Sequence, residues 1–323
     1  MNNNENFFVG PFKDDLFEYY QHKINLGYAF ESEKNKLKAF DNYTNFVKCS
    51  KLTLELIYDF IDKRKEISSN SKASYICVLR GYVRYLYNSK RCNFLVPERI
   101  YKRKREKIPH IFTNEEIKIF FSILNDFYPD DKFKNSLINI YFELLYCTGM
   151  RSGECLNIKV NDIDFNNNSI TLYNTKNKVD RRIVVSDKLI VKLSNFINEF
   201  REIISVGDNG YIFIRHSGKK YKPNDLYSTF RKILYYAGIE HTDNGPRVHD
   251  FRHTFCVNSY KKILRDGGNY YNHVMALSAY VGHKNFISTE YYLRLTSELY
   301  PEVRKVTENY TEHLIKDMEC LDE

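Results

Sequence analysis

A short, strongly basic stretch divides this chain into two parts of different character. The stretch is PERIYKRKREK, residues 97–107, which begins with a proline and holds six basic and two acidic residues. Before it, apolar residues recur at helical spacing without strand-like alternation, whereas both helical and strand-like patterns occur after it. A chain of 323 residues is long for one hydrophobic core and sufficient for two. The sequence therefore predicts two folded domains connected through this stretch.

The part before the basic stretch is predicted to be an all-helical domain. The segment FKDDLFEYYQHKINLGY places apolar residues at helical spacing, namely Phe12, Leu16, Tyr19, Tyr20 and Ile24. The segments LTLELIYDFIDKRKE and SKASYICVLRGYVRYLYNSK show the same spacing. We therefore expect helices across residues 12–96, after an N-terminal tail at residues 1–11 and before a linker at residues 97–112.

The part after the linker combines helices with a few short strands. Thr113 and Glu116 fit a capping box, and the apolar helix NSLINIYFELLYCTGM should end at Gly149. Strand-like runs then occupy VNDIDFNNNSITLY and RRIVVS, and helical patterns return in KLIVKLSNFINEF, PNDLYSTFRKILYYAG and VHDFRHTFCVNSYKKIL. The predicted fold is mainly α with a small antiparallel β-sheet, over residues 113–300, followed by a C-terminal tail at residues 301–323.

Composition narrows the class of protein only in part. No apolar run approaches the length of a membrane span, and the N-terminus MNNNENFFVG lacks the pattern of a signal peptide, so we expect a soluble cytoplasmic protein without a membrane partner. The seven cysteines include no CxxC pair, which is typical of reduced thiols rather than of disulfides or a zinc site. The formal net charge of +8 fits a nucleic-acid partner, although many basic proteins bind none.

Five short polar motifs follow one another in the second part of the chain. They are TGMRSGE, YNTKNKVDRR, HDFRH, VGH and STEYY. The candidate functional residues within them are Arg151, Lys176, His249, Arg252, His283 and Tyr292. Each motif alone is weak evidence, because lysines on turns, single histidines and tyrosines are usually structural or simply exposed. Five motifs in this order and at these spacings are not expected by chance.

These residue types suit a reaction in which one phosphate ester is exchanged for another. Arginine offers two hydrogen bonds to a phosphate and stays charged at any working pH. Lysine or histidine can protonate the leaving 5′-oxygen. A tyrosine hydroxyl, whose pKa is about 10, can attack phosphorus once nearby cations lower that pKa, and can later be displaced. Because each step replaces one ester by another, we expect no metal, ATP or other cofactor.

The motif HDFRH also permits a different interpretation. His249 and His253 stand at positions i and i+4 and could hold a zinc ion, as the pair in HExxH does. Asp250 and Arg252 lie between these two histidines. The fixed positive charge of Arg252 between the two ligands disfavours the binding of a metal cation. No third ligand is evident nearby in the sequence. A metallohydrolase is therefore the last of the functions that we consider.

Because of these five motifs, residues 113–300 resemble the catalytic domain of the tyrosine recombinases, the phage integrase family. By this resemblance, Arg151 is the first arginine that binds the phosphate, and His249 and Arg252 form the HxxR pair. The resemblance makes Lys176 the lysine of a β-hairpin that protonates the leaving 5′-oxygen. Lys178 lies in the same turn and remains an alternative to Lys176.

The last two motifs complete the resemblance. His283 matches the histidine of the family's GH motif, and Tyr292, nine residues later, matches the nucleophile. Tyr291 is adjacent and competes with Tyr292 for this role. The family spacing favours Tyr292, and a shift by one residue on a helix would turn the hydroxyl away by about 100°.

The resemblance also implies a domain organisation and a set of partners. Residues 12–96 would be a helical core-binding domain, forming with the catalytic domain a two-domain clamp around double-stranded DNA. Lys102, Arg103, Lys104 and Arg105 would contact DNA phosphates from the linker, which could instead be a plain solvated connection. Family members act as homotetramers on two DNA segments, through 3′-phosphotyrosyl bonds and a Holliday junction. The need for accessory proteins or for a partner recombinase is left open.

The C-terminal tail carries an apolar stripe of its own. The stripe consists of Val303, Val306, Tyr310 and Leu314 in an otherwise polar segment. In the tyrosine recombinases a C-terminal helix is often donated to the neighbouring protomer. The stripe would serve that purpose, or it would pack on its own domain.

The sequence thus predicts a site-specific DNA recombinase that integrates, excises or resolves a DNA element. Two other functions stay open. A type IB topoisomerase-like enzyme would use similar chemistry to relax supercoils without pairing two sites. A non-catalytic DNA-binding protein would keep the fold without cleaving DNA. The complete set of six candidate residues favours the recombinase.

Overall fold

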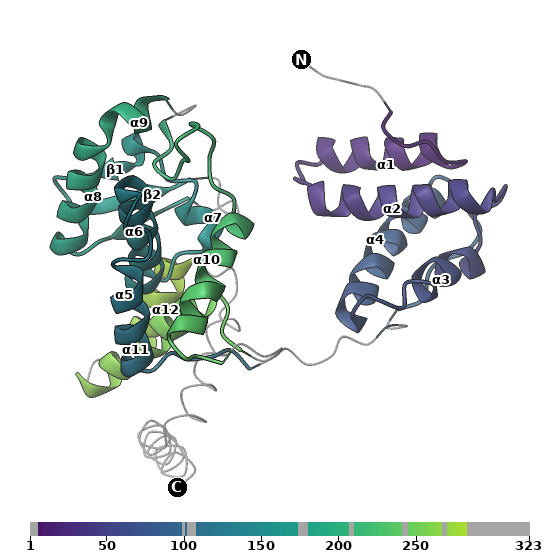
Figure 1. The fold of residues 1–323 in the computed structure, drawn as a ribbon. Helices are drawn as coiled ribbons and strands as arrows, with labels where there is room; N and C mark the ends of the chain where they lie inside the picture. Colours follow the sequence, from purple (N-terminus) through teal and green to yellow (C-terminus); the bar gives the residue numbers. More distant parts are fainter. Residues whose placement is uncertain are drawn as a thin grey trace, which may run out of the picture. The chain divides into compact units, whose positions relative to one another are not determined.

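The chain folds into two compact units. The computed structural model describes residues 6–98, 101, 108–173, 180–206, 210–240, 245–266 and 270–282. The units comprise residues 1–106 and 107–323, and the boundary falls inside the stretch predicted as a linker (Figure 1). Each unit has its own hydrophobic core. No helix among the described residues is both long and apolar enough to cross a membrane.

The first unit is helical, as its sequence periodicity predicted. Its helices are α1 (Lys13–Asn25), α2 (Glu31–Val47), α3 (Leu54–Asp62) and α4 (Ser69–Asn88). The Thr53 hydroxyl accepts a hydrogen bond from a backbone N–H in the first turn of α3, and the Ser68 hydroxyl does the same for α4. Helix α4 packs against each of the other three helices.

Helix α2 did not stand out in the sequence pattern, and its buried face explains why. That face includes Asp41 and Thr44, two polar residues that interrupt the apolar spacing. The Asp41 carboxylate accepts hydrogen bonds from the backbone N–H groups of Val9, at 2.7 Å, and Gly10, at 2.9 Å. Asp41 therefore holds the N-terminal segment against the helix, and a search for apolar periodicity does not detect such a contact.

The second unit is mostly helical and contains one small sheet, which confirms the predicted fold class. Its helices are α5 (Asn114–Leu124), α6 (Lys132–Thr148), α7 (Ser152–Cys155), the 3-10 helix η1 (Val160–Asp162), α8 (Asp187–Glu199), α9 (Arg201–Val206), α10 (Pro223–Tyr236), α11 (Asp250–Arg265) and α12 (Tyr270–Val281). The predicted capping box of Thr113 and Glu116 starts α5. Helix α6 is buried around most of its circumference and packs against α5, α7, α8 and α11 (Figure 1).

The sheet is antiparallel with the strand order β1-β2-β3. Its strands are β1 (Ile163–Asp164), β2 (Ser169–Leu172) and β3 (Arg181–Val184). Ile170 pairs with Ile183, and Leu172 pairs with Arg181 where the strands approach the turn between β2 and β3. Strand β3 also contacts α12. The register therefore places the first residue of β3 at the base of the turn that was predicted to carry the hairpin lysine.

Helix α12 was not predicted from the sequence. Val274, Leu277 and Val281 of this helix form a small core with Cys256 and Tyr260 of α11. The helix ends at Val281 and is followed by Gly282, whose φ of +70° lies in the left-handed region that glycine adopts readily. Packing on α11 thus fixes the backbone up to the residue that precedes His283.

Candidate active site

The motif TGMRSGE forms a sharp turn between α6 and α7. Gly149 follows the last residue of α6 with a φ of +61°. A Cβ atom at this position would lie 2.4 Å from Cδ1 of Phe255 on α11, so the turn needs glycine for its backbone and for its space. The Thr148 hydroxyl accepts a hydrogen bond from the Met150 N–H, at 3.3 Å. The turn delivers Arg151 to the start of α7.

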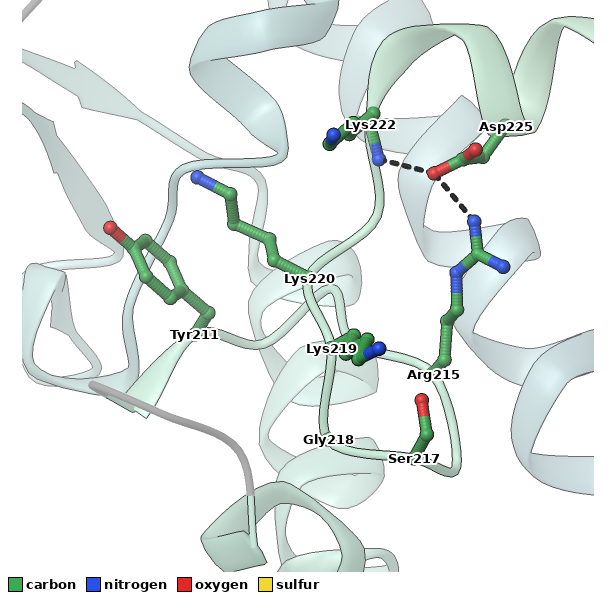
Figure 2. A pocket seen from close by; sticks show the side chains of 8 residues that line it. All are labelled: Tyr211, Arg215, Ser217, Gly218, Lys219, Lys220, Lys222 and Asp225. Atoms are coloured by element: carbon green, nitrogen blue, oxygen red, sulfur yellow. Dashed lines mark hydrogen bonds and ion pairs between the residues drawn. The ribbon is translucent and has the colours of Figure 1, made fainter.

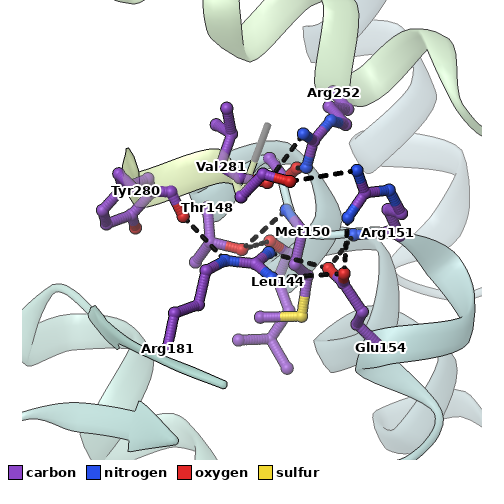
Figure 3. Close-up of polar contacts among 11 residues, drawn as sticks. Leu144, Thr148, Met150, Arg151, Glu154, Arg181, Arg252, Tyr280 and Val281 are labelled. Atoms are coloured by element: carbon purple, nitrogen blue, oxygen red, sulfur yellow. Dashed lines mark hydrogen bonds and ion pairs between the residues drawn. The ribbon is translucent and has the colours of Figure 1, made fainter. Parts of the chain in front are cut away.

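Glu154 holds Arg151 in place by both its backbone and its side chain. The Arg151 N–H donates to Glu154 Oε2 at 2.9 Å, and Arg151 Nη1 donates to Glu154 Oε1 at 2.7 Å (Figure 3). The second terminal nitrogen, Nη2, donates to the Gly282 carbonyl at 3.3 Å. The Arg151 side chain keeps 22% of its surface exposed, so the guanidinium is oriented by the protein and still accessible. Glu154 therefore braces this loop.

Arg181, which the sequence motifs did not single out, joins the same cluster. Its Nη1 and Nη2 donate to Glu154 Oε1 at 3.2 Å and Oε2 at 2.8 Å, and its Nε donates to the Tyr280 carbonyl at 2.8 Å (Figure 3). Strand alternation contained a signal for it, because Arg181 shares the inward face of β3 with the buried Ile183. A charged residue on that face needs a buried partner.

The Glu154 carboxylate lies between two guanidinium groups and stays ionised. Burial would raise its pKa, but hydrogen bonds from the Arg181 side chain and the Arg151 N–H, together with the charge of Arg181, lower that pKa to about 2. At neutral pH the three side chains therefore carry one net positive charge. That charge is held in fixed geometry at the end of α6.

Arg252 is a buried arginine that connects the ends of two helices. It lies on α11 with 2% of its surface exposed. Its Nη1 donates to the Gly149 carbonyl at 2.9 Å and its Nη2 to the Val281 carbonyl at 2.7 Å. Both carbonyls lie at helix C-termini, where the helix dipole favours a cation. Arg252 thus fastens α11 to the ends of α6 and α12.

His249 immediately precedes α11 and differs in environment from Arg252. The Asp250 carboxylate accepts a hydrogen bond from the Arg247 N–H at 2.8 Å, which starts the helix at Asp250. His249 is exposed, although it stands only one helical turn before the buried Arg252. Its ring contacts the ring of His253 edge to face, with centroids 4.9 Å apart. Within the described ranges, no group of three histidine, cysteine, aspartate or glutamate residues could hold a metal ion.

Arg151 and Arg252 meet at one short segment of backbone. They bind the carbonyls of two consecutive residues, Val281 and Gly282, which immediately precede His283 in the sequence. The remaining predicted residues lie outside the part of the chain that the structure describes: Lys102, Arg103, Lys104, Arg105, Lys176, Lys178, His283, Tyr291, Tyr292 and the tail stripe Val303, Val306, Tyr310 and Leu314. Their roles stay predictions.

A second feature of this unit is a hollow with a basic lining, here called the basic hollow (Figure 2). Its lining residues are Tyr211, Arg215, Ser217, Gly218, Lys219, Lys220, Lys222 and Asp225. Four of them are basic and one is acidic. Asp225 pairs with Arg215 at 2.8 Å and accepts from the Lys222 N–H at 2.7 Å. This surface was not predicted from the sequence, because its residues form no recognisable motif.

The model of the phage integrase family matches residues 111–298, which is more than half of the chain and contains all the described arginines of the site. The chain belongs to the phage integrase family. It is therefore a tyrosine-type site-specific recombinase by class, and the class predicted from the motifs is confirmed.

Individual relatives resemble this phage integrase family member over most of its length. Tyrosine recombinase XerC of Staphylococcus aureus is 25% identical over 303 residues, covering 91% of this chain and 87% of the relative. The XerH recombinase, in a post-cleavage complex with its palindromic difH substrate, has a TM-score of 0.64 at 18% identity, covering 93% of this chain and 85% of that one. A lambda integrase tetramer bound to a Holliday junction has a TM-score of 0.63 at 15% identity, covering 90% and 78%. The structural likeness establishes the fold.

Proposed function

We propose that this protein cleaves and rejoins double-stranded DNA at specific sites through a 3′-phosphotyrosyl intermediate. The observation that carries the proposal is the convergence of Arg151 and Arg252 on the carbonyls of Val281 and Gly282. This convergence brings two cations to the backbone that leads into His283. Family membership supports site-specific recombination as the general activity.

The two arginines would bind the scissile phosphate. Their guanidinium groups are oriented before substrate arrives, Arg151 by Glu154 and Arg252 by the carbonyls at two helix ends. Such preorganised cations stabilise the negative charge that grows on the non-bridging oxygens in the transition state, without reorganisation at the moment of reaction. His249 and His283 would supply further hydrogen bonds or protons to these oxygens.

The covalent step would then use the residues near the C-terminus and on the hairpin turn. The Tyr292 hydroxyl gives up its proton to solvent and attacks phosphorus, a bond forms between its oxygen and phosphorus, and the bond from phosphorus to the 5′-oxygen breaks. Lys176 protonates that leaving oxygen. In the second step a 5′-hydroxyl of the partner DNA loses its proton and attacks the phosphotyrosine, a bond forms between the 5′-oxygen and phosphorus, and the bond from phosphorus to the tyrosine oxygen breaks, so that the tyrosine leaves and regains a proton. Because each step exchanges one phosphate ester for another, the energy of the ester bond is retained, and the proposed reaction uses neither ATP nor a metal ion.

The proposed assembly is a tetramer on two DNA segments that passes through a Holliday junction. The solved lambda integrase tetramer on a Holliday junction supports this arrangement for a protein of the same fold. In this arrangement residues 12–96 act as the core-binding domain and residues 113–300 as the catalytic domain. The linker residues Lys102–Arg105, which connect the two domains in the sequence, contact phosphates of the DNA. The apolar stripe of residues 301–323 packs on a neighbouring protomer.

The basic hollow offers a further place for the DNA backbone. Lys219 and Lys222 are exposed, and the ammonium group of Lys220 lies 4.3 Å from the centre of the Tyr211 ring (Figure 2). Because only Asp225 offsets the four basic side chains, the hollow carries a local excess of positive charge. Such a surface attracts the phosphates of a duplex without reading its sequence.

The test of the proposed function is covalent trapping on nicked DNA. Duplexes cloned from the DNA that flanks the gene would carry a nick placed so that cleavage releases a short fragment and prevents rejoining. Wild type, Tyr292→Phe and Tyr291→Phe would be incubated in EDTA without ATP and then denatured. We expect a denaturant-resistant protein–DNA adduct with wild type and Tyr291→Phe, and none with Tyr292→Phe.

Other outcomes of the trapping experiment would contradict the proposal in distinct ways. An adduct with Tyr292→Phe would remove Tyr292 as nucleophile. The absence of any adduct, on the flanking DNA and on a library of random sites, would favour a non-catalytic DNA-binding protein. Relaxation of every supercoiled plasmid irrespective of sequence would instead favour a topoisomerase-like enzyme.

A further inference from the structure

We propose that Arg181 is a positioning residue, which ties the β2–β3 hairpin to the arginine cluster so that the turn presents its lysine to the leaving 5′-oxygen. This inference rests on the proposed function and adds a residue to it. Arg181 acts through Lys176 and does not itself bind the substrate.

The contacts of Arg181 connect three separate elements. Arg181 belongs to β3, Glu154 to α7, and Tyr280 to α12, and the guanidinium bonds to both other residues. Its two terminal nitrogens engage both oxygens of the Glu154 carboxylate, the bidentate geometry that arginine forms and lysine does not. Only 8% of the side chain is exposed. The hairpin is therefore attached at its base to the same carboxylate that orients Arg151.

Gly282 provides independent evidence for a fitted contact. A Cβ atom at Gly282 would lie 2.9 Å from Arg181 Nη1 and 3.0 Å from its Cζ, so the guanidinium packs directly on the glycine backbone. The carbonyl of the same glycine accepts the hydrogen bond from Arg151 Nη2. Gly282 thus contacts both arginines, and no side chain would fit there without moving Arg181.

The position of Arg181 in the hairpin explains its effect on the turn. Arg181 pairs with Leu172, and the two residues bound the turn that contains Lys176. Lys176 is five residues from Arg181, within about 18 Å even for a fully extended chain. The bonds of Arg181 to Glu154 and Tyr280 therefore fix the end of β3 from which this length of chain begins. A proton donor held near its acceptor acts at a much higher effective concentration than a mobile one.

The neighbouring Arg182 is a natural control within the same hairpin. It points to the other face of β3, with 54% of its side chain exposed. Its partners, Ser169 at 2.6 Å and Asp164, belong to the same small sheet. Arg182 therefore stabilises the sheet locally and, among the residues that the structure describes, forms no hydrogen bond or ion pair with α7 or α12. Loss of Arg182 should leave the placement of the turn relative to Arg151 intact.

The choice of leaving group distinguishes two roles that Arg181 could have. One is to position the lysine that protonates the leaving oxygen, and the other is to bind the scissile phosphate. A 5′-oxygen needs a proton as its bond to phosphorus breaks. A 5′-sulfur leaves as a thiolate without that proton, because thiols have a pKa of only about 8.5. The phosphorus–sulfur bond breaks and the bond from Tyr292 to phosphorus forms as before. A misplaced proton donor should therefore slow cleavage of the substrate with a 5′-oxygen and leave cleavage of the substrate with a 5′-sulfur unchanged.

The experiment measures single-turnover adduct formation on two versions of the DNA site that wild type cleaves. One version has the natural 5′-oxygen at the scissile phosphate and the other a bridging 5′-sulfur. The proteins are wild type, Arg181→Gln, Arg181→Lys, Arg182→Gln and Arg151→Gln. We expect Arg181→Gln to be slower by about 10²-fold on oxygen, the scale of a misplaced catalytic group, and within about threefold of wild type on sulfur.

The comparison variants make the outcome decisive. Arg182→Gln should match wild type on both substrates, whereas Arg151→Gln should be slow on both because it loses a phosphate contact. Arg181→Lys keeps the charge without the bidentate contact and should show the same oxygen-specific defect in weaker form, with a melting temperature close to that of wild type. Equal slowing of Arg181→Gln and Arg181→Lys on oxygen and sulfur, or no slowing on either, would overturn the inference. Failure of wild type itself on both substrates would instead reject the proposed function, and the inference with it.

Discussion

At the residue scale, the site depends on one buried carboxylate shared by two arginines. Glu154 is almost fully buried, and its two oxygens receive hydrogen bonds from the Arg151 and Arg181 side chains. Removing one partner of a buried ion pair usually costs more than the pair contributes, because the remaining charge stays buried without compensation. Glu154 should therefore affect both the stability of the second unit and the orientation of Arg151.

The pH dependence of stability should reveal the charge on Glu154. Its pKa is lowered in the folded state to about 2 from a reference of 4.5, so its ionised form stabilises the fold fully above pH 4.5. That contribution, about 3 kcal/mol at neutral pH, is lost as the pH falls from 4.5 toward 2. Glu154→Gln should thus be less stable than wild type at pH 7, by a margin that shrinks in this acidic range.

Chemical denaturation of both proteins at several pH values measures this margin. The difference between wild type and variant removes the contribution of the other carboxylates, which titrate in both. A margin that stays constant from pH 7 to acidic pH would show that Glu154 is not ionised between the two arginines.

At the scale of elements, the site is built where helix ends meet. Gly149 directly follows helix α6 and Gly282 directly follows helix α12, and both glycines have positive φ. Their left-handed conformations turn the chain and leave carbonyls that Arg252 and Arg151 bind. The arginines therefore depend on how the two helices terminate as well as on their own positions in the sequence.

Substitution of the glycine that ends α6 should disturb this arrangement. Gly149→Ala places a Cβ atom 2.4 Å from a ring carbon of Phe255 and requires an alanine at a φ of +61°. Strain of the left-handed backbone alone costs about 1–2 kcal/mol, and the clash adds to it. We expect a lower melting temperature and slower adduct formation.

Gly153 supplies the matched control for this prediction. It lies in α7, and a Cβ atom there would meet nothing within 4 Å. Gly153→Ala should be neutral or more stable than wild type by up to about 1 kcal/mol, as expected for a helical position. Equal melting temperatures for the two variants would contradict the role assigned to Gly149.

At the scale of the whole molecule, binding to DNA depends on where the positive charge gathers. The formal net charge is +8, and the basic hollow concentrates four cationic side chains against one carboxylate. Contacts between lysines and phosphates release counterions, so each contact contributes to the salt dependence of affinity. The distribution of charge should therefore be measurable in binding experiments without knowledge of the reaction.

Neutralising two lysines of the hollow should weaken DNA binding in a salt-dependent way. For Lys219→Gln combined with Lys222→Gln, we expect the slope of log affinity against log salt to decrease by about 2 in magnitude on duplex DNA. Fluorescence anisotropy at several salt concentrations measures the slope. Lys118→Gln combined with Lys188→Gln, two exposed lysines outside the hollow, is the control. Equal slopes for the two double variants would show that the hollow does not face DNA.

Local patterns in the sequence predicted much of this molecule. Apolar spacing identified α1, α3 and α4, Gly149 marked the end of α6, and the motifs identified Arg151, His249 and Arg252 as candidates. These features were readable because each depends on residues within a few positions of one another. Helices α2 and α12 were not predicted, because their buried faces do not follow from local apolar spacing. Polar residues lie on the buried face of α2, and packing on α11 defines the buried face of α12.

By itself, the sequence determined the family, the fold class and the identity of the candidate residues, because these reside in the order and spacing of short motifs. Only the tertiary structure decided how the arginines are held. Arg181 bonds to a carboxylate 27 residues away and to a carbonyl 99 residues away, and Arg151 to a carbonyl 131 residues away. Backbone carbonyls are present at every residue and leave no mark in the sequence. Their selection as partners depends on where the helices end and how they pack.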